Sequence, residues 1–286
     1  MRCVYSIMLV VLFAACEKKS AMYIPYAGDK IVVNSLIQPD SLIYIRVTQS
    51  KQVREAGNLQ FPELSKATVM LEEDGIPLPA PQWQVINGRG YYVAAAAKTS
   101  RQYHIRVLAD GLTSVEATDS TPTRPQLTEA HAEYNINRVR FTLTDPVNET
   151  NNYRIRLYKA DSSNGTLVLN RADTVKCRLD PSYNNNFTDV ISNAYYSEIL
   201  ITDERINGKA IVFVIQTAKE VTAPYMAVEV SGLTASAYRY LQGTYSQRQD
   251  DKVNLSFDPV NIYSNVQNGY GIVAGVNASL VGLKVQ

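Results

Sequence analysis

Residues that build metal centres and disulfide frameworks are scarce in this sequence. Its 286 residues include 3 cysteines, 2 histidines and 1 tryptophan. Catalytic zinc usually draws on two or three histidines or on closely spaced cysteines. His104 and His131 are the only histidines, and they fall in different predicted domains. We therefore expect neither a metal site nor another bound cofactor.

An excess of charge of one sign is also missing. The chain carries 28 Lys and Arg residues against 27 Asp and Glu residues, a formal net charge of +1 at pH 7. Loss of Arg2 with an N-terminal signal would bring this balance to zero. A long-range field that attracts nucleic acid needs a clear basic excess. We therefore expect no nucleic-acid partner.

Sequence patterns of catalysis are absent as well. No Gly-x-Ser-x-Gly elbow occurs, and no spacing singles out a pair of catalytic carboxylates. The glycines of the segment Gly269–Gly275 superficially suggest a nucleotide loop, but no lysine follows and the next residues read as a strand. We interpret these glycines as points of close backbone approach or as a bulge. The sequence thus predicts a non-catalytic protein.

No apolar run at the N-terminus is long enough to cross a bilayer. The run Ile7–Ala15 is far shorter than the ~20 residues that a transmembrane helix needs. With Arg2 before it and small residues at its end, it predicts a signal peptide over residues 1–15. Cys16 follows directly, as in a bacterial lipobox, so we predict that Cys16 is lipidated and that residues 16–29 form a tether. The alternative is an ordinary signal peptide cut nearby, which would leave Cys16 free.

Disulfides are not expected to stabilise the fold. Once Cys3 leaves with the signal and Cys16 carries lipid, Cys177 is the only thiol, so stability must come from core burial. Cys177 lies in an alternating, strand-like stretch, which favours a half-buried and inert thiol.

Period-two alternation of apolar and polar residues dominates the first part of the chain. It occurs in Leu42–Thr48, Ala67–Glu72 and Tyr103–Val107, after an opening strand at Lys30–Ile37. This period puts one set of side chains against a core and the other towards water. Turn signals such as Glu73-Asp74-Gly75 separate the runs. We predict an immunoglobulin-like β-sandwich over residues 30–120.

A stiff, proline-rich stretch over residues 121–126 predicts a linker to a second domain. Residues 127–286 show further strands at 210–217 and 226–230 and a glycine-spaced final strand at 269–285. One helix is expected at about 234–249, with Tyr238, Leu241 and Tyr245 on one face. The predicted fold is therefore mostly β: an immunoglobulin-like sandwich followed by a second β-rich sandwich domain that carries one helix.

Four arginines form the one local charge feature in the second domain. Arg138 and Arg140 alternate with apolar residues on one predicted strand, and Arg154 and Arg156 do so on the next. If the two strands form a hairpin, all four side chains point to the same side of the sheet and need a counter-charge. The counter-charge is either a carboxylate of this chain or an acidic partner or ligand.

Motifs spread over most of the mature length carry a family resemblance. They include Cys16-Glu17-Lys18, Ile31–Asn34, Phe61–Val69, Gly90–Tyr92, Asp145-Pro146, Asn152–Arg154, Tyr238–Leu241, Pro259–Val266 and Asn268–Ile272. In their order and spacing they resemble a family of Bacteroidota lipoproteins, the domain-of-unknown-function 4249 family. The resemblance implies an outer-membrane lipoprotein commonly encoded beside TonB-dependent receptors, with no assigned reaction, ligand or catalytic residue.

From these observations we expect a lipid-anchored, non-catalytic accessory or binding module of the outer membrane, on either its periplasmic or its cell-surface face. Its partner would be a TonB-dependent receptor. The arginine face and the C-terminal segment around Tyr263, Asn265, Asn268 and Tyr270 are the candidate contacts. Two alternatives stay open: a secreted carboxylate-based hydrolase acting on glycans, and a structural or adhesive envelope protein.

Overall fold

The computed structural model describes residues 26, 28–52, 61–147, 149–187, 190, 193–250 and 262–286. More than half of the described residues lie in strands. The described residues also contain one α-helix, α2 (Ala235–Asp250), and one short 3-10 helix, η2 (Asn185–Phe187). The prediction of a mostly β fold with one helix is confirmed.

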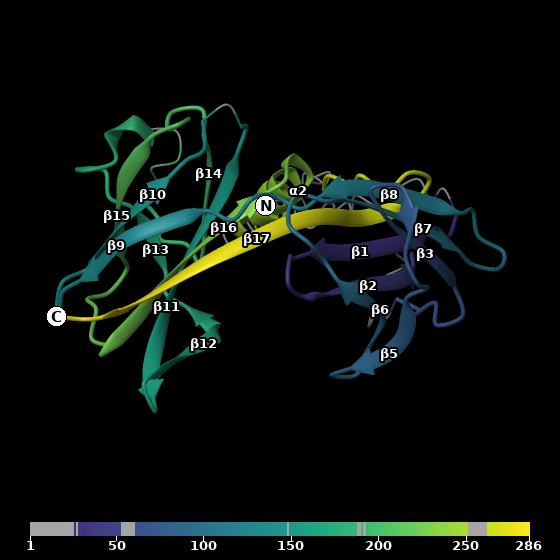
Figure 1. The fold of residues 1–286 in the computed structure, drawn as a ribbon, viewed down its shortest axis with the longest axis horizontal. Helices are drawn as coiled ribbons and strands as arrows, with labels where there is room; N and C mark the ends of the chain where they lie inside the picture. The colour runs from purple at the N-terminus through teal and green to yellow at the C-terminus, as the bar shows by residue number, and fades with distance from the viewer. Residues whose placement is uncertain are drawn as a thin grey trace, which may run out of the picture.

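One large nine-stranded sheet runs through the whole molecule (Figure 1). Its strands, in spatial order, are β12 (Thr166–Thr174), β11 (Asn152–Ser163), β16 (Tyr225–Leu233), β17 (Tyr270–Lys284), β1 (Ile31–Ile37), β2 (Leu42–Gln49), β6 (Arg89–Ala96) and β5 (Gln82–Ile86), with β14 (Ile199–Thr202) paired to β11.

Two four-stranded sheets complete the fold. The first has the order β4 (Ile76–Pro77), β3 (Thr68–Glu73), β7 (Gln102–Leu108), β8 (Val115–Ser120). The second has the order β13 (Cys177–Leu179), β15 (Ala210–Thr217), β10 (Arg138–Thr144), β9 (Gln126–Ala132). Each packs on one half of the large sheet, which defines an N-terminal and a C-terminal sandwich with separate apolar cores.

Strand β17 joins the two sandwiches. Its first part pairs in parallel with β1, from Tyr270 to Gly275, and its second part pairs antiparallel with β16, from Val276 to Lys284. Val273 belongs to the N-terminal core and Leu283 to the C-terminal core. Both are odd-numbered positions of one uninterrupted strand, and alternate residues point to opposite faces. The two small sheets therefore cover the same face of the large sheet.

Glycines let β17 approach its neighbours closely. A Cβ on Gly275 would lie 1.8 Å from the carbonyl oxygen of Ser120, and one on Gly271 would lie 2.0 Å from that of Val33. Gly271 also has φ +109, a conformation that L side chains rarely adopt. The expectation that the glycines of this segment allow close backbone approach is confirmed.

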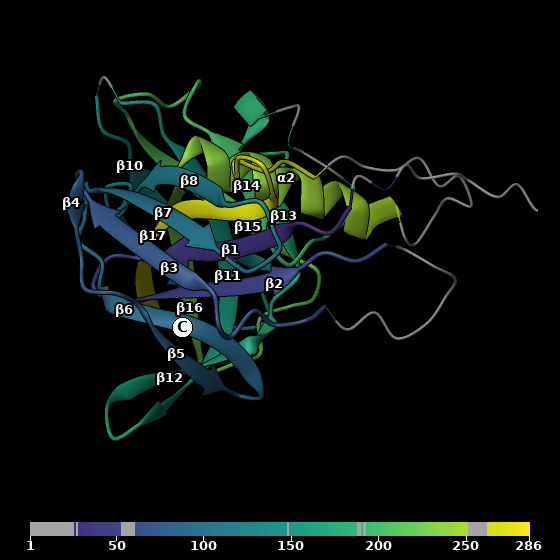
Figure 2. The same cartoon turned by 90° about the vertical axis from the view of Figure 1, so that its right-hand side faces the viewer.

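Helix α2 covers the opposite face of the large sheet at its centre. Ala237 packs with Leu233, Ile272, Ala274 and Val276, and partly buried tyrosines of the helix join this third cluster. Thr234 caps the helix, because its Oγ1 accepts the N–H of Ala237 at 3.3 Å. In Figure 2, α2 lies next to β17, in agreement with the contacts of the helix with β16 and β17.

The alternating runs of the N-terminal sandwich bury the side chains that the pattern predicted. Ile43, Ile45 and Val47 of β2 are almost fully buried. The turn at Asp74-Gly75 has φ values of 51 and 78, as two-residue hairpin turns of type I′ require.

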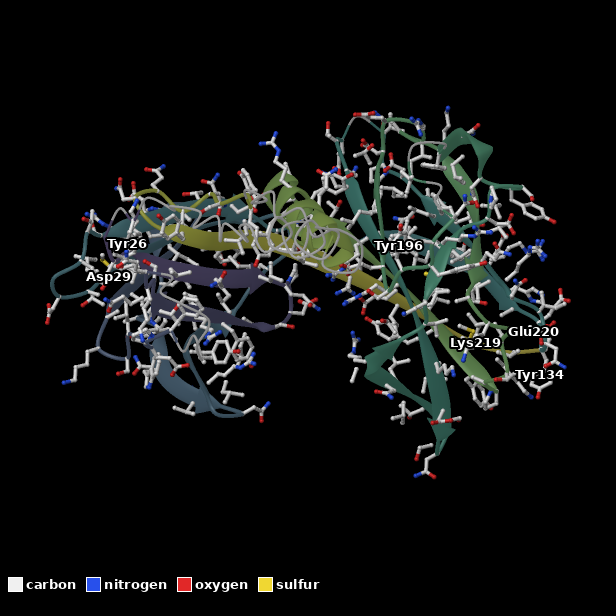
Figure 3. The ribbon with its side chains drawn as sticks, turned by 180° about the vertical axis from the view of Figure 1, so that it is seen from behind. Tyr26, Asp29, Tyr134, Tyr196, Lys219 and Glu220 are labelled. Atoms are coloured by element: carbon white, nitrogen blue, oxygen red, sulfur yellow. The ribbon has the colours of Figure 1, made fainter. Side chains whose placement is uncertain are left out.

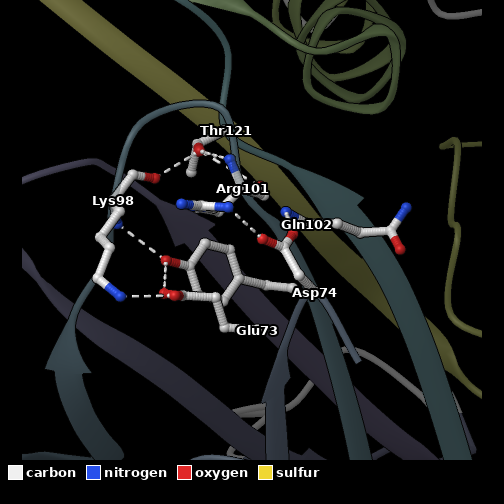
Figure 4. A network of polar contacts seen from close by, with 7 residues as sticks. Glu73, Asp74, Lys98, Arg101, Gln102 and Thr121 are labelled. Atoms are coloured by element: carbon white, nitrogen blue, oxygen red, sulfur yellow. Dashed lines mark hydrogen bonds and ion pairs between the residues drawn. The ribbon is translucent and has the colours of Figure 1, made fainter. Parts of the chain in front are cut away.

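A polar network closes one end of the N-terminal sandwich (Figure 4). Glu73 accepts hydrogen bonds from Lys98 Nζ at 2.6 Å and from Tyr103 OH at 2.8 Å. Asp74 accepts from Arg101 at 2.7 Å, and Thr121 Oγ1 donates to the carbonyl of Lys98 at 2.7 Å. These contacts join the ends of β3, β7 and β8.

The connection between β8 and β9 contains the proline-rich stretch that was predicted as a linker. Asn277 of β17 donates from Nδ2 to the carbonyl of Pro122 at 2.9 Å, and Ser279 donates from Oγ to that of Pro125. The stretch is therefore held against β17 along its length. The predicted domain boundaries stay a prediction.

Candidate functional site

The four candidate arginines do not form one face, which corrects the hairpin predicted from the sequence. β10 pairs with β9 and β15, whereas β11 pairs with β12, β14 and β16. The predicted apolar faces are right, since Phe141 and Ile155 both enter the C-terminal core. The chain after β10 crosses to the other sheet of the sandwich, so the two strands face one another across that core. Arginines that alternate with these core residues therefore lie on opposite outer faces.

Arg138 and Arg140 lie on the outer face of the small C-terminal sheet. Arg138 Nε donates to Asp180 at 2.7 Å, and its guanidinium lies 5.8 Å from the centre of the Tyr183 ring. Burial alone would raise the pKa of Asp180, but the hydrogen bonds from Arg138 and Ser182 and the charge of Arg138 together hold this pKa below its usual value. Arg140 is exposed and makes no ion pair within the described part of the chain. Both arginines line a cavity of about 160 Å³.

Arg154 and Arg156 belong to a largely buried charge cluster on the other face. Glu229 is only 2% exposed and accepts hydrogen bonds from Arg156 and from Arg171, the latter at 2.7 Å. Burial alone would raise the pKa of Glu229, but the hydrogen bond and charge of Arg156, followed by those of Arg171, lower it. The guanidinium groups of Arg156 and Arg171 also lie over the ring of Tyr158.

Arg154 makes the weakest polar contacts of the arginines in this cluster. It is 9% exposed, its Nε is buried without a partner, and its other contacts are Ser231 Oγ at 3.3 Å and Glu198 at 3.9 Å. Burial lowers its pKa, and the neighbouring charge of Arg156 lowers it further. For Arg138, Arg154 and Arg156 the required counter-charge thus comes from this chain.

The C-terminal candidate segment is held rigidly beside β17. Asn265 donates from Nδ2 to the carbonyl of Val273 at 2.7 Å and accepts its N–H at 3.0 Å. Arg239 lies over the ring of Tyr263, which packs with the helix cluster. Asn265 and Tyr263 are therefore partly buried and hold the segment in place. Asn268, which has φ 61, and Tyr270 are exposed.

A cavity of about 410 Å³ at the outer end of the C-terminal sandwich was not predicted. Its lining comes from β11, from the β12–β13 and β15–β16 connections and from the start of β16, and includes the lysines Lys159, Lys176 and Lys219. Figure 3 shows Lys219 and Glu220 at the opposite end of the molecule from Tyr26 and Asp29. One pattern in the sequence could have pointed to this cavity. Lys159 follows Ile155 and Leu157 at the spacing of core-facing positions, where a lysine is unusual.

The predicted absence of a metal site stays a prediction for the whole chain. Within the ranges that the structure describes, no three His, Cys, Asp and Glu side chains are grouped to hold a metal ion. The cavities of about 410 and 160 Å³ are each lined by one carboxylate, Glu220 and Glu133 respectively. Cys177 is fully buried rather than half-buried as predicted, and burial raises the pKa of its thiol to about 12, which agrees with an inert thiol.

The predicted signal peptide and Cys16 lie outside the described residues. In the part of the chain that is described, no helix has the length and apolar character of a membrane span.

The fold defines a mostly β protein in which two sandwiches share one sheet. Comparison with known families then places the chain: residues 18–279 match the model of DUF4249, a domain of unknown function, and the protein belongs to this family. A search of curated proteins found no match.

Proposed function

We propose that this protein is a lipid-anchored lipoprotein of the outer membrane of Bacteroidota and acts as a non-catalytic binding module for a TonB-dependent receptor. The anchor would be Cys16, which follows an apolar run and small residues as in a lipobox. A covalent lipid at this position would fix one end of the molecule at the membrane surface.

The observation that carries this proposal is the position of the C-terminal segment relative to the tether. Val32 and Tyr270 are paired at the starts of β1 and β17, and Lys30 Nζ lies 5.1 Å from the centre of the Tyr270 ring. The chain therefore enters the fold directly beside Tyr270. Residues 16–29 span at most about 50 Å when fully extended, which keeps this end of the fold near an anchored Cys16.

This end also presents apolar surface in a fixed conformation. Tyr270 is 45% exposed and Ile262 is 36% exposed, while the bidentate bond of Asn265 to Val273 holds the segment that links them. Aromatic and aliphatic side chains on a rigid backbone suit protein contacts, because little conformational entropy is lost on binding. A receptor embedded in the same membrane is the partner that such an end can reach.

Co-purification from detergent-solubilised outer membranes tests the proposal. The tagged wild-type protein is expected to carry a diacyl group on Cys16 by mass spectrometry and to recover a TonB-dependent receptor. Replacing Tyr270 and Ile262 by Glu should reduce receptor recovery by about tenfold or more while leaving lipidation unchanged.

A matched control is Tyr134→Glu. Tyr134 is 56% exposed and lies at the other end of the molecule from Tyr26 and Asp29 (Figure 3), so receptor recovery should stay at the wild-type level. An unlipidated wild-type protein, or one that recovers no receptor, contradicts the proposal. Equal losses in the Tyr134 and Tyr270 variants would place the contact elsewhere.

A further inference from the structure

The lysine-lined cavity of the C-terminal sandwich has the build of a ligand site. Its volume of about 410 Å³ lies within the ~300–1,000 Å³ of small-molecule sites. Thr217, Val221 and Met226 are almost completely buried and form its floor. Apolar side chains of Val175 and Ala223 contribute to its walls. A methionine in the floor can adapt to differently shaped apolar groups.

Charge of one sign gathers at this cavity although the whole chain is nearly neutral. Lys159, Lys176 and Lys219 line it together with a single carboxylate, Glu220. No ion pair joins any of these three lysines to a carboxylate within the described ranges. Three arginines of this sandwich differ, since Arg138, Arg154 and Arg156 have carboxylates of the chain as partners.

Backbone hydrogen bonds fix the segments that carry the lysines. The N–H of Val175 donates to the carbonyl of Leu157 at 2.8 Å, and the N–H of Ala218 donates to that of Lys176 at 2.9 Å. Lys159 leaves β11 on the side of Leu157, which faces the core. The backbone positions of the three lysines are thus fixed around one cavity before any ligand arrives.

We propose that this cavity binds an amphipathic organic anion, with an acyl chain on the apolar floor and a carboxylate among the three lysines. Ammonium groups on flexible stems act as point charges and accept a carboxylate without demanding one fixed geometry. A carboxylate also relieves the mutual repulsion of the lysines. This assignment stands independently of the proposed receptor partner, since the cavity lies at the other end of the molecule.

Isothermal titration calorimetry of the full-length protein with sodium decanoate tests the assignment. Saturable binding is expected for decanoate and not for decyltrimethylammonium, which has the same chain and the opposite charge. Inorganic phosphate should bind far more weakly, because it lacks the chain. Partition of decanoate into bound lipid or detergent is the same for every variant, so differences between variants report the cavity.

Variants separate the charge from the apolar floor. The double variant Lys176→Gln and Lys219→Gln should weaken decanoate binding by about tenfold or more, and Ala218→Trp should abolish binding by filling the cavity. Lys66→Gln, at an exposed lysine of the N-terminal sandwich, is the matched control and should bind as the wild type does. The proposal fails if wild type shows no saturable binding, if the cationic probe binds equally well, or if the double variant matches the control.

Discussion

The two sandwiches share a sheet but differ in how many charged side chains they bury. In the N-terminal sandwich the buried polar residues among those described are Ser35, Thr48 and Thr121, none of which is charged. The C-terminal sandwich buries six charged side chains: Asp145, Arg154, Asp180, Glu198, Asp203 and Glu229. One half therefore depends mainly on apolar burial, and the other depends in addition on buried charges that must keep their partners.

The contrast extends to the charge networks of each half. In the N-terminal network of Figure 4, Lys98 and Arg101 are more than half exposed, and exposed ion pairs contribute little, about 0–1 kcal/mol. In the C-terminal cluster, Glu229 is buried and forms ion pairs with two arginines, Arg156 and Arg171. Removing one member of a buried pair leaves an uncompensated charge, which costs far more than the pair itself contributes.

The largest expected effect follows from breaking the buried cluster at Glu229. Glu229→Gln should lower the free energy of unfolding by about 3 kcal/mol or more, because Arg156 loses its counter-charge in a largely enclosed site. Chemical denaturation followed by circular dichroism measures the loss.

Glu73→Gln is the control in the other half, where the partner Lys98 can be solvated. It should cost about 1 kcal/mol or less. Trp83, the single tryptophan, packs against the N-terminal core, so its fluorescence reports that half separately. Equal costs for the two variants would remove the contrast between the sandwiches.

The second expected effect concerns the strand that couples the halves. Gly275→Ala places a Cβ against the backbone of Ser120, where only backbone movement can relieve the clash. We expect a loss of about 2–3 kcal/mol, detected both by Trp83 fluorescence and by circular dichroism. Gly75→Ala, at an open turn position with φ +78, should cost about 1 kcal/mol. A Gly275 variant as stable as wild type would show that β8 and β17 can shift apart freely.

The third expected effect is a pH dependence of the penalty at Glu229. Its folded-state pKa lies below the usual value of 4.5, so its contribution to stability is complete above pH 4.5 and is lost as the pH falls through the folded pKa. The stability difference between wild type and Glu229→Gln should therefore shrink below pH 4.5. Thermal unfolding of both proteins from pH 7 to pH 3 measures it, and a constant difference over this range contradicts the argument.

The smallest expected effect is a difference in stability between replacing an arginine on one outer face of the C-terminal sandwich and replacing an arginine on the other. Arg154→Ala should cost about 1–2 kcal/mol, because Glu198 is left buried without its ion-pair partner. Arg140→Ala, at an exposed residue without an ion pair among the described residues, should change stability by less than about 0.5 kcal/mol. Chemical denaturation of the two variants measures the difference between their unfolding midpoints. A larger loss of stability in Arg140→Ala than in Arg154→Ala would contradict the prediction.

Individual strands could be predicted from the sequence, but their partners could not. The run 210–217 coincides with β15, and the expected helix at 234–249 is shifted by one residue from α2. Period two is a local signal, so it correctly places Phe141 and Ile155 in a core. It carries no information on which sheet a strand joins, and the β10–β11 hairpin was wrong for that reason.

The candidate sites show the same limit. Alternation correctly assigns Arg138 and Arg154 to the sides opposite the core residues, yet their carboxylates, Asp180 and Glu198, come from distant segments. The lysine cavity combines Lys159, Lys176 and Lys219 from three segments that the fold brings together. No single stretch of sequence contains that arrangement.

The pairing of β1 with β17 also sets an order of events during synthesis. Among the described residues β1 is the first strand and β17 is the last, with Val32 opposite Tyr270. Contacts so far apart in the chain form slowly, because a long loop must close first. Until the final residues emerge, β1 and β16 each present an unpaired edge, which is a template for wrong association. The two edges are therefore covered only once β17 is available.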